Sequence, residues 1–360
     1  MSDVVQIKQF ELSERKSLLK FLRIVYPKEP RKHEEVFWEW HFLENPHTSP
    51  TDIPLWIVKK GDDIVGQLAT IPVEIKVSHE TRRAIWILDF IVREDFRGQG
   101  LGKRLVATAG KSYPIMMALG INKQSTAVFR KLGWASLGGI HRYHRLLYAG
   151  DALDEISRLR PLRLLGNLAY AGARARIRNM STASVGVVRS ISVFDNSFDD
   201  LWRRASTHWP CAVVRNARYL DWQFIRQPGK KFEILGLFSQ QKLLGYVVLF
   251  FRKSNVGGHS PKAAISDICY DPSMPDQIID QLLKAALSLA LERRAGSLVT
   301  DVLDCWVEER LKRHGFWRIK DAPQFMAFTS EGSSPIYTPN NWFLTRSDSD
   351  VSIFENSNVA

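Results

Sequence analysis

Short apolar runs alternate along the chain with stretches in which apolar residues recur every three or four positions, a pattern typical of strands and helices packed in layers. The run at 84–92 is rich in Ile and Leu and predicts a buried strand. A glycine-rich turn at 97–102 follows, and an amphipathic helical pattern begins directly after it. A helix that opens from such a turn leaves its first N–H groups without partners, and its dipole adds positive potential, so this stretch predicts an anion site.

Further strands and helices are predicted on both sides of the strand at 84–92. The helical pattern that holds two tryptophans ends before Asn45-Pro46, because a residue before proline avoids the α region. The predicted elements of the first half are a strand and a helix within 5–25, a helix at 36–42, a hairpin of strands at 55–59 and 64–77, the strand at 84–92, a strand at 114–119, a helix at 123–132 and a closing strand at 135–147.

The second half of the chain repeats the first at a constant offset. The same 182 residues separate Trp40 from Trp222 and Gly133 from Gly315, which indicates a duplicated domain. The glycine turn is not repeated: the second half has DPSMPDQIID there, in which prolines remove N–H donors and aspartates repel an anion. The predicted organisation is a domain at 1–148, a basic connector at 149–190, a second, degenerate domain at 191–345 and a polar tail at 346–360.

The motifs of the first half resemble those of the GNAT N-acetyltransferase superfamily. The pattern Arg-x-x-Gly-x-Gly after a strand is similar to its acyl-CoA loop, and Asn122 followed by FRKLGW is similar to its second conserved block. A P-loop would need Gly-Lys-Ser/Thr and a Rossmann fingerprint Gly-x-Gly-x-x-Gly, and neither is present in the turn. The expected fold is therefore α/β (α+β) with a mixed sheet, in two tandem GNAT-like domains. A looser resemblance is to GNAT proteins associated with bacterial cell-surface polysaccharide synthesis.

The resemblance implies which residues bind acetyl-CoA as co-substrate. In the superfamily the central strand parts from its neighbour, so that its backbone pairs with the pantetheine arm, while N–H groups of the loop bind the pyrophosphate. The expected residues are Phe90, Ile91, Val92, Arg97, Gly98, Gln99, Gly100, Leu101, Gly102, Lys103, Asn122 and Phe129. Phe129 departs from the family pattern, because many members have a tyrosine there that protonates the leaving thiolate.

Asp89 and Tyr143 are the candidate catalytic residues. A carboxylate on a half-buried strand beside the thioester is suited to act as general base, and Glu74 on the adjacent strand is a second candidate. The alternative is structural: Asp89 pairs with an arginine or caps a loop, which its counterpart Asp267 in the second half favours. In place of the missing tyrosine, Tyr143 or water protonates the thiolate, or CoA leaves as the thiolate.

Composition narrows the partners and the compartment. The net charge of +12 suits anionic ligands such as CoA, but no basic motif with interleaved aromatics predicts specific nucleic-acid binding. The three cysteines lack metal-ligand spacing, and no metal is expected. No apolar run reaches the roughly 18 residues of a membrane span, and the N-terminus does not resemble a signal peptide, so a cytoplasmic location is expected. The arginine- and leucine-rich stretch at 155–180 predicts an interdomain connector or, alternatively, a surface for an acidic partner or an anionic membrane.

Together these features predict an acetyltransferase that moves an acetyl group from acetyl-CoA to an amine by direct attack on the thioester. The looser resemblance suggests an amino sugar of a cell-surface polysaccharide precursor as the acceptor. The alternative is a non-catalytic module that binds acyl-CoA or an acyl carrier, for which Phe129 is the main argument.

Overall fold

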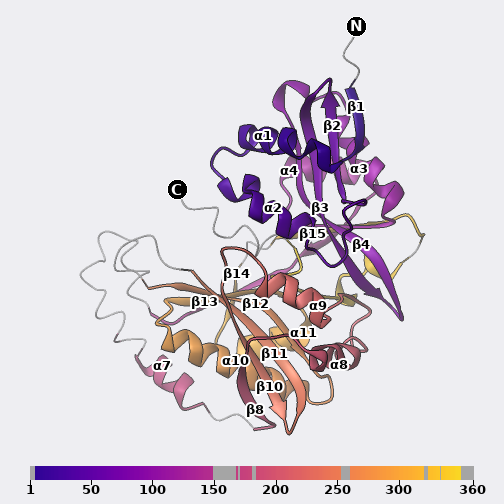
Figure 1. Cartoon of the computed structure of the whole chain (residues 1–360). Coiled ribbons are helices and arrows are strands. Elements are labelled where there is room, and N and C mark those ends of the chain that lie inside the picture. Colours follow the sequence, from indigo (N-terminus) through magenta and orange to yellow (C-terminus); the bar gives the residue numbers. More distant parts are fainter. Residues whose placement is uncertain are drawn as a thin grey trace.

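The computed structural model describes residues 5–148, 168, 171–180, 184–252, 260–319, 323–332 and 334–349. These residues form two halves of mixed β-sheet with helices packed against the strands (Figure 1). The predicted mixed α/β class is confirmed. None of the helices in the described part of the chain is long and apolar enough to cross a membrane.

The elements of the first half follow the predicted order, except at its end. They are β1 (Val5–Gln9), the short η1 (Leu12–Glu14), α1 (Arg15–Val25), η2 (Pro30–His33), α2 (Glu35–Phe42), β2 (Leu55–Lys60), β3 (Asp63–Val77), β4 (Glu80–Val92), η3 (Glu94–Phe96), α3 (Leu101–Ser112), β5 (Ile115–Leu119), α4 (Lys123–Lys131), β6 (Ala135–Gly139) and β7 (His141–Leu146).

The second half follows this order with three additions: α7 before its first strand, β9 between its first two helices after that strand, and a C-terminal strand. Its elements are α7 (Ala171–Arg178), β8 (Val187–Ile191), α8 (Asn196–Ala205), β9 (Cys211–Val213), α9 (Ala217–Leu220), η5 (Asp221–Ile225), β10 (Phe232–Ser239), β11 (Lys242–Arg252), β12 (Lys262–Tyr270), α10 (Pro275–Glu292), β13 (Ser297–Leu303), α11 (Cys305–Arg313), β14 (Trp317–Ile319), β15 (Gln324–Thr329), η6 (Pro335–Tyr337), η7 (Pro339–Asn341) and β16 (Trp342–Thr345). Of the predicted connector, 168, 171–180 and 184–190 are described, whereas 149–167, 169–170 and 181–183 lie outside the described residues.

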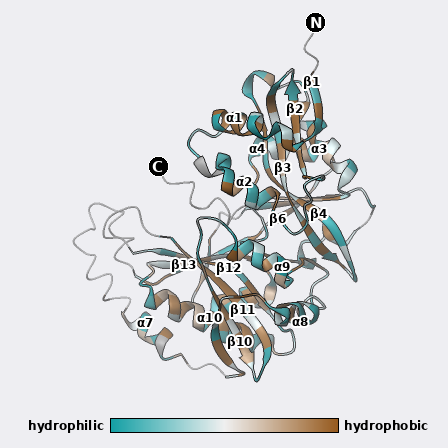
Figure 2. Cartoon of the chain, viewed as in Figure 1, coloured by the Kyte–Doolittle hydropathy of each residue, from teal (hydrophilic) through white to brown (hydrophobic). Residues whose placement is uncertain are grey.

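Both faces of the first sheet are buried, because successive side chains of a strand point to opposite faces. On β2, Trp56 and Val58 pack with α3, whereas Leu55 and Ile57 pack with α1 and α2. Apolar residues accordingly gather on the strands and on the inward faces of the helices (Figure 2). This two-sided burial explains why the strands read as nearly continuous apolar runs in the sequence.

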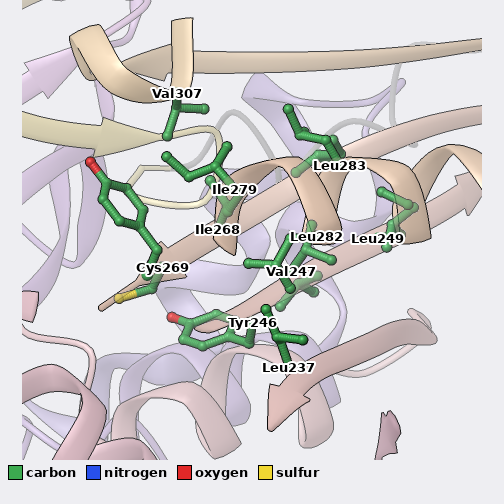
Figure 3. Packing of buried hydrophobic residues seen from close by; sticks show 14 of the residues in the cluster. Leu237, Tyr246, Val247, Leu249, Ile268, Cys269, Ile279, Leu282, Leu283 and Val307 are labelled. Carbon is green, nitrogen blue, oxygen red and sulfur yellow. The ribbon is translucent and has the colours of Figure 1, made fainter. Parts of the chain in front are cut away.

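The core of the second half lies between β11, β12 and α10. Buried residues of α10 recur every three or four positions, which gives the helix one apolar face. Figure 3 shows Ile279, Leu282 and Leu283 of this helix close to Val247 and Leu249 of β11. The second half therefore has a packed core of its own.

The two halves exchange one strand each. β7, from the first half, lies between β13 and β14, with His144 opposite Val299 and Trp317. β15, from the second half, lies between β5 and β6, with Ala327 opposite Met117 and Ala135. The predicted single strand at 135–147 that closes the first half is therefore wrong.

The reason for this departure is a break within the predicted strand. Gly138 has a φ of 88°, in the left-handed region, and β6 ends directly after it. The chain then continues as β7 in the other sheet. The Gly-Gly pair in the sequence was the local signal for two strands, but it does not say to which sheet the second strand belongs.

The repeated tryptophans form the centre of the contact between the halves. The Trp40 indole N–H donates to the carbonyl of Trp222 at 2.9 Å, and the Trp222 indole donates to the carbonyl of Trp40 at 2.9 Å. Their rings stack with centroids 4.8 Å apart. Such reciprocal contacts are those of a two-fold axis, so the duplicated halves are related like the subunits of a symmetric dimer.

The residues at 346–349, predicted as the start of a polar tail, are buried in the second half. Arg215 donates to Asp348 Oδ2 at 2.6 Å, and Arg346 pairs with Asp301. The polar side chains are thus matched inside the protein rather than exposed, while 350–360 lie outside the described residues.

Candidate active site

The candidate site is built where β4 and β5 separate. β4 pairs with β3 as far as Val92, but with β5 only from Ile85 to Ile87. A register shift falls at the same place, because Asp89 lies opposite Ala69 while Ile87 lies opposite Thr70. Leu88 is therefore the extra residue of a bulge that turns the end of β4 away from β5. The parting of the central strand, which the sequence resemblance implied, is present.

A cavity of about 620 Å³ opens between these strands and the glycine loop. Gly98 and Gly100 have φ of 80° and 72°, conformations that favour glycine, and Gly100 is the N-cap of α3 without a side-chain hydrogen bond. The predicted residues that line the cavity are Phe90, Ile91, Val92, Arg97, Gly98, Gly100, Leu101, Gly102, Lys103 and Asn122. Residues absent from the prediction also line it, namely Tyr26, Phe96, Gln124, Ser125, Val128 and Lys131.

Two helix N-termini meet at this cavity. Asn122 caps α4, since its side-chain oxygen accepts the backbone N–H of Ser125 at 2.8 Å, and both residues line the cavity. The N-terminus of α3 lies on the same cavity through Leu101 and Gly102. Unpaired N–H groups and the dipoles of both helices give this space a positive potential. The arrangement suits a ligand with phosphate groups.

Phe129 and Gln99 are the two predicted cofactor residues that do not line the cavity. Phe129 is fully buried behind Phe90, with ring centroids 5.7 Å apart, and it stacks on Trp134 at 4.5 Å. Direct contact of Phe129 with a ligand is therefore not supported. Its packing supports the wall of the cavity through Phe90.

Asp89 lies in an ion pair at the edge of the site. Lys32 Nζ is 2.7 Å from Asp89 Oδ1, and the Tyr26 hydroxyl donates to the same oxygen at 3.2 Å. Burial lowers the pKa of Lys32, but the carboxylates of Asp89 and Glu29 together raise it more, with a net upward shift. The alternative prediction was that Asp89 pairs with an arginine. Asp89 does form an ion pair, but its partner is Lys32. Tyr26, which contacts the carboxylate, lines the cavity, whereas Asp89 lines a smaller neighbouring cavity.

Tyr143 is not part of the site, and the prediction of a catalytic role for it is wrong. The exchange of β7 places Tyr143 in the sheet of the second half, where it is buried and donates to Glu308 at 2.8 Å. Burial, followed by this hydrogen bond, raises the pKa of Tyr143 well above its usual value. His141 contacts the same carboxylate at 2.7 Å.

His41 makes the stability of the protein sensitive to acid. It is fully buried on α2, and burial lowers the pKa of His41 to about 4. The unfolded chain, with an ordinary pKa of 6.5, binds a proton below that pH while the folded protein does not. This contribution to the free energy of unfolding is complete above pH 6.5 and falls by about 3 kcal/mol as the pH drops to about 4.

We expect the variant His41→Gln, which copies Gln223 at the same place in the second half, to lose most of this pH dependence. Urea unfolding of both proteins at pH 7.5 and pH 5 measures the difference. Equal pH slopes for the wild type and the variant would contradict the assignment, because all other titrating groups are shared.

In the described part of the second half, the place that corresponds to the cavity of the first half is closed. β12 and β13 part after Ile265, and β13 then pairs with β16 through Val302. The space that is open in the first half is thus occupied by the chain's own C-terminal strand. At the position of the glycine loop, Asp271 pairs with Arg204 at 2.6 Å and with Lys242 at 3.1 Å. At this position the second half therefore lacks the features that suit an anionic ligand in the first half.

The part of the chain that holds the site matches a known protein family. Residues 15–134 match the Acetyltransferase (GNAT) family. No curated protein matches the chain in sequence. A protein from Enterococcus faecalis V583 described as a probable N-acyltransferase has 13% identity and a TM-score of 0.61, covering 91% of this chain and 73% of its own.

Two further solved structures have the same fold. A GCN5-related N-acetyltransferase from Anabaena variabilis ATCC 29413 has 12% identity and a TM-score of 0.60, covering 90% of this chain and 72% of its own. N-myristoyltransferase of Saccharomyces cerevisiae, solved with bound myristoyl-CoA, has 12% identity and a TM-score of 0.56, covering 91% and 83%. The family match and this fold support an acyl-CoA-dependent N-acyltransferase. Residues 15–134, which hold the glycine loop and the cavity, are thus similar to the GNAT acetyltransferase family.

Proposed function

We propose that the chain transfers an acetyl group from acetyl-CoA to an amine, in the cavity between β4 and β5. The observation that carries this proposal is the combination of the glycine loop, two helix N-termini and an unpaired strand end around one space of about 620 Å³. The loop backbone at 97–103 binds the diphosphate. The backbone at 88–92, which β5 does not pair, binds the pantetheine arm and polarises the thioester carbonyl.

Asp89 takes the proton of the amine in this proposal. The amine nitrogen attacks the thioester carbonyl carbon, a C–N bond forms, the C–S bond breaks, and CoA leaves as the thiolate. Lys32 Nζ lies 2.7 Å from Asp89 Oδ1 and holds this oxygen of the carboxylate in place. Holding the carboxylate beside the cavity supplies the positioning that such a step needs.

The acceptor we propose is an amine, with an amino sugar of a cell-surface polysaccharide precursor as the first hypothesis to test. A panel of amino-sugar nucleotides, free amino sugars, peptides and polyamines should give CoA release with one class only. The result is measured as free thiol over time at a fixed acetyl-CoA concentration. Release with peptides or polyamines and none with amino sugars would reject this acceptor while leaving the acyltransferase proposal in place.

A second candidate function is a module that binds acyl-CoA without turnover. It is favoured by the packing of Phe129 and Tyr143, since neither side chain lines the cavity to protonate a thiolate. Tight binding of acetyl-CoA with no release of CoA on any acceptor would support this candidate. Because the pKa of a thiol is about 8.5, CoA is a tolerable leaving group without an acid, and we favour the enzyme.

The variant Gly102→Val tests whether the loop cavity binds CoA. A Cβ at Gly102 would lie 2.8 Å from the ring of Phe90, so this ring, which lines the cavity, must shift. We expect the affinity for CoA, measured by titration calorimetry, to fall at least about tenfold, which corresponds to about 1.4 kcal/mol.

The matched control for this variant is Gly110→Ala, on the same helix. A Cβ there meets only the flexible end of Met116, at 3.1 Å, and Met116 does not line the cavity. This control should bind CoA like the wild type. Equal affinity of Gly102→Val and wild type would exclude the loop cavity as the CoA site.

A further inference from the structure

A second, much smaller cavity lies behind the carboxylate of Asp89. Its volume is about 20 Å³, and its lining is apolar except for Lys32, Trp38, His41, Gln67 and Asp89. A single water molecule needs about 10–15 Å³ and two to four polar partners. The cavity therefore has the size for one water, and the question is whether its polar atoms require one.

Three buried polar atoms in this lining have no hydrogen-bond partner among the described residues: His41 Nδ1, Gln67 Oε1 and Trp38 Nε1. His41 Nε2 lies 3.4 Å from the carbonyl oxygen of Thr70, which can only accept, so Nε2 carries the proton. Burial lowers the pKa of His41 to about 4, which leaves the ring neutral and Nδ1 an acceptor. Each such atom without a partner costs about 1–3 kcal/mol.

One water satisfies this set of atoms. It has two hydrogens for the two acceptors, His41 Nδ1 and Gln67 Oε1, and two lone pairs, one of which accepts the indole N–H of Trp38. The three side chains come from α2 and β3, and all are more than nine-tenths buried. The polar groups thus match a water in number and in kind.

The second half shows what the same position looks like when it is filled by protein. Tyr246 is the counterpart of Gln67 in the second half. Gln67 lies opposite Ile91, two residues after Asp89, and Tyr246 lies opposite Cys269, two residues after Asp267. The Tyr246 hydroxyl donates to Asp267 at 2.7 Å, and Thr345 donates to the other carboxylate oxygen at 2.7 Å. Both carboxylate oxygens of Asp267 thus accept hydrogen bonds from protein groups. In the first half the side chain of Gln67 leaves a gap in this place.

We infer that one ordered water occupies the cavity behind Asp89, bound by His41, Gln67 and Trp38, and that it holds the Asp89 carboxylate in position for proton transfer. The role of the water in positioning Asp89 rests on the proposed function. The presence of the water does not depend on that function. Filling the space prevents the carboxylate from rotating into it. His41 and Gln67 are positioning residues, because they act on the reaction only through the water and Asp89.

The charged and titratable groups around Asp89 are consistent with this role. Lys32 and Tyr26, on the segment between α1 and α2, both contact Oδ1, and Glu29 lies 3.3 Å from Lys32. His41 faces the cavity from α2 as a neutral ring. Oδ1 of Asp89 already contacts Lys32 and Tyr26, so the other oxygen, Oδ2, accepts the proton. The orientation of Oδ2 depends on what fills the cavity.

The first test is a crystal structure of the full chain at a resolution that orders single waters. We expect one peak within hydrogen-bonding distance of His41 Nδ1 and Gln67 Oε1. An empty cavity, or a protein donor in its place, would overturn the inference. This result is independent of any turnover.

The second test replaces the water with the side chain of the other half. In Gln67→Tyr the phenol should displace the water and donate to Asp89 directly. We expect unchanged CoA affinity and a decrease of kcat by at least about tenfold, because the carboxylate loses the position that proton transfer needs. Gln67→Met, which removes the acceptor but keeps the length, should lower kcat in the same way.

Tyr246→Phe is the matched control in the second half. It removes a hydrogen bond from the buried Asp267 and should lower the melting temperature while leaving kcat unchanged. Unchanged kcat in both Gln67 variants would overturn the positioning role even if the water is present. Absence of turnover with every amine, alongside the water peak, would reject the proposed function and the positioning role with it, but not the water.

Discussion

Produced separately, the fragments 1–150 and 151–360 are expected not to fold, whereas produced together they should form a stable one-to-one complex. The first fragment lacks β15, which lies between β5 and β6, and the second lacks β7, which lies between β13 and β14. Each sheet is then left with two unpaired inner edges and a missing buried strand. Circular dichroism melting and size-exclusion chromatography of the three preparations measure the result.

A longer C-terminal fragment, 139–360, is the control for this experiment. It carries β7 and hence Tyr143 and Leu147, which are buried in the core of the second half. We expect this fragment to unfold cooperatively and the shorter fragment 151–360 not to do so. If 151–360 alone melts as cooperatively as 139–360, the exchanged strand does not contribute to folding and the pairing of β7 in the second sheet is wrong.

The duplication could be predicted from the sequence, but the exchange of strands could not. The repeat offset is visible in single residues such as Trp40 and Trp222, because it depends on identity and spacing. Which sheet β7 and β15 join depends instead on strand edges, one in each sheet, that are equivalent because the halves are duplicated. Either strand pairs with either edge by the same hydrogen bonds, so local pattern alone does not select the exchanged arrangement.

The loop side of the site was predictable because it is local. A strand, a glycine turn and a helix follow one another within about twenty residues, and the anion site is a property of their backbone. Asn122 was found from its motif, and its role as the cap of α4 explains why an asparagine fits there.

The other side of the site depends on segments distant in sequence. Tyr26 and Lys32 come from the connection between α1 and α2, and they reach Asp89 only after the sheet has formed. The net charge of the chain gave no means of selecting one lysine among many. A basic residue just before the second helix in both halves, Lys32 and Arg215, was the one signal in the sequence that pointed to a cation beside each aspartate.

Asp89→Asn is expected to lower turnover by about 10²–10⁴-fold, the usual contribution of a general base, with little change in the affinity for CoA. The amide keeps the shape of the side chain but has no basic oxygen. Asp89 does not line the loop cavity itself, so CoA binding should survive the change. Steady-state rates with the best acceptor and calorimetric titration with CoA separate the two effects.

The duplicated fold supplies the control for this last substitution. Asp267 occupies the same place in the second half and pairs with Arg215 in the same way as Asp89 pairs with Lys32. Asp267→Asn should therefore destabilise the protein, because it leaves a buried arginine less well compensated, without changing the rate per folded molecule. If both substitutions lower stability and neither lowers the rate, the aspartate is structural in both halves. If Asp89→Asn alone abolishes turnover, the first copy has acquired a catalytic role that the second, closed by the C-terminal strand, does not have.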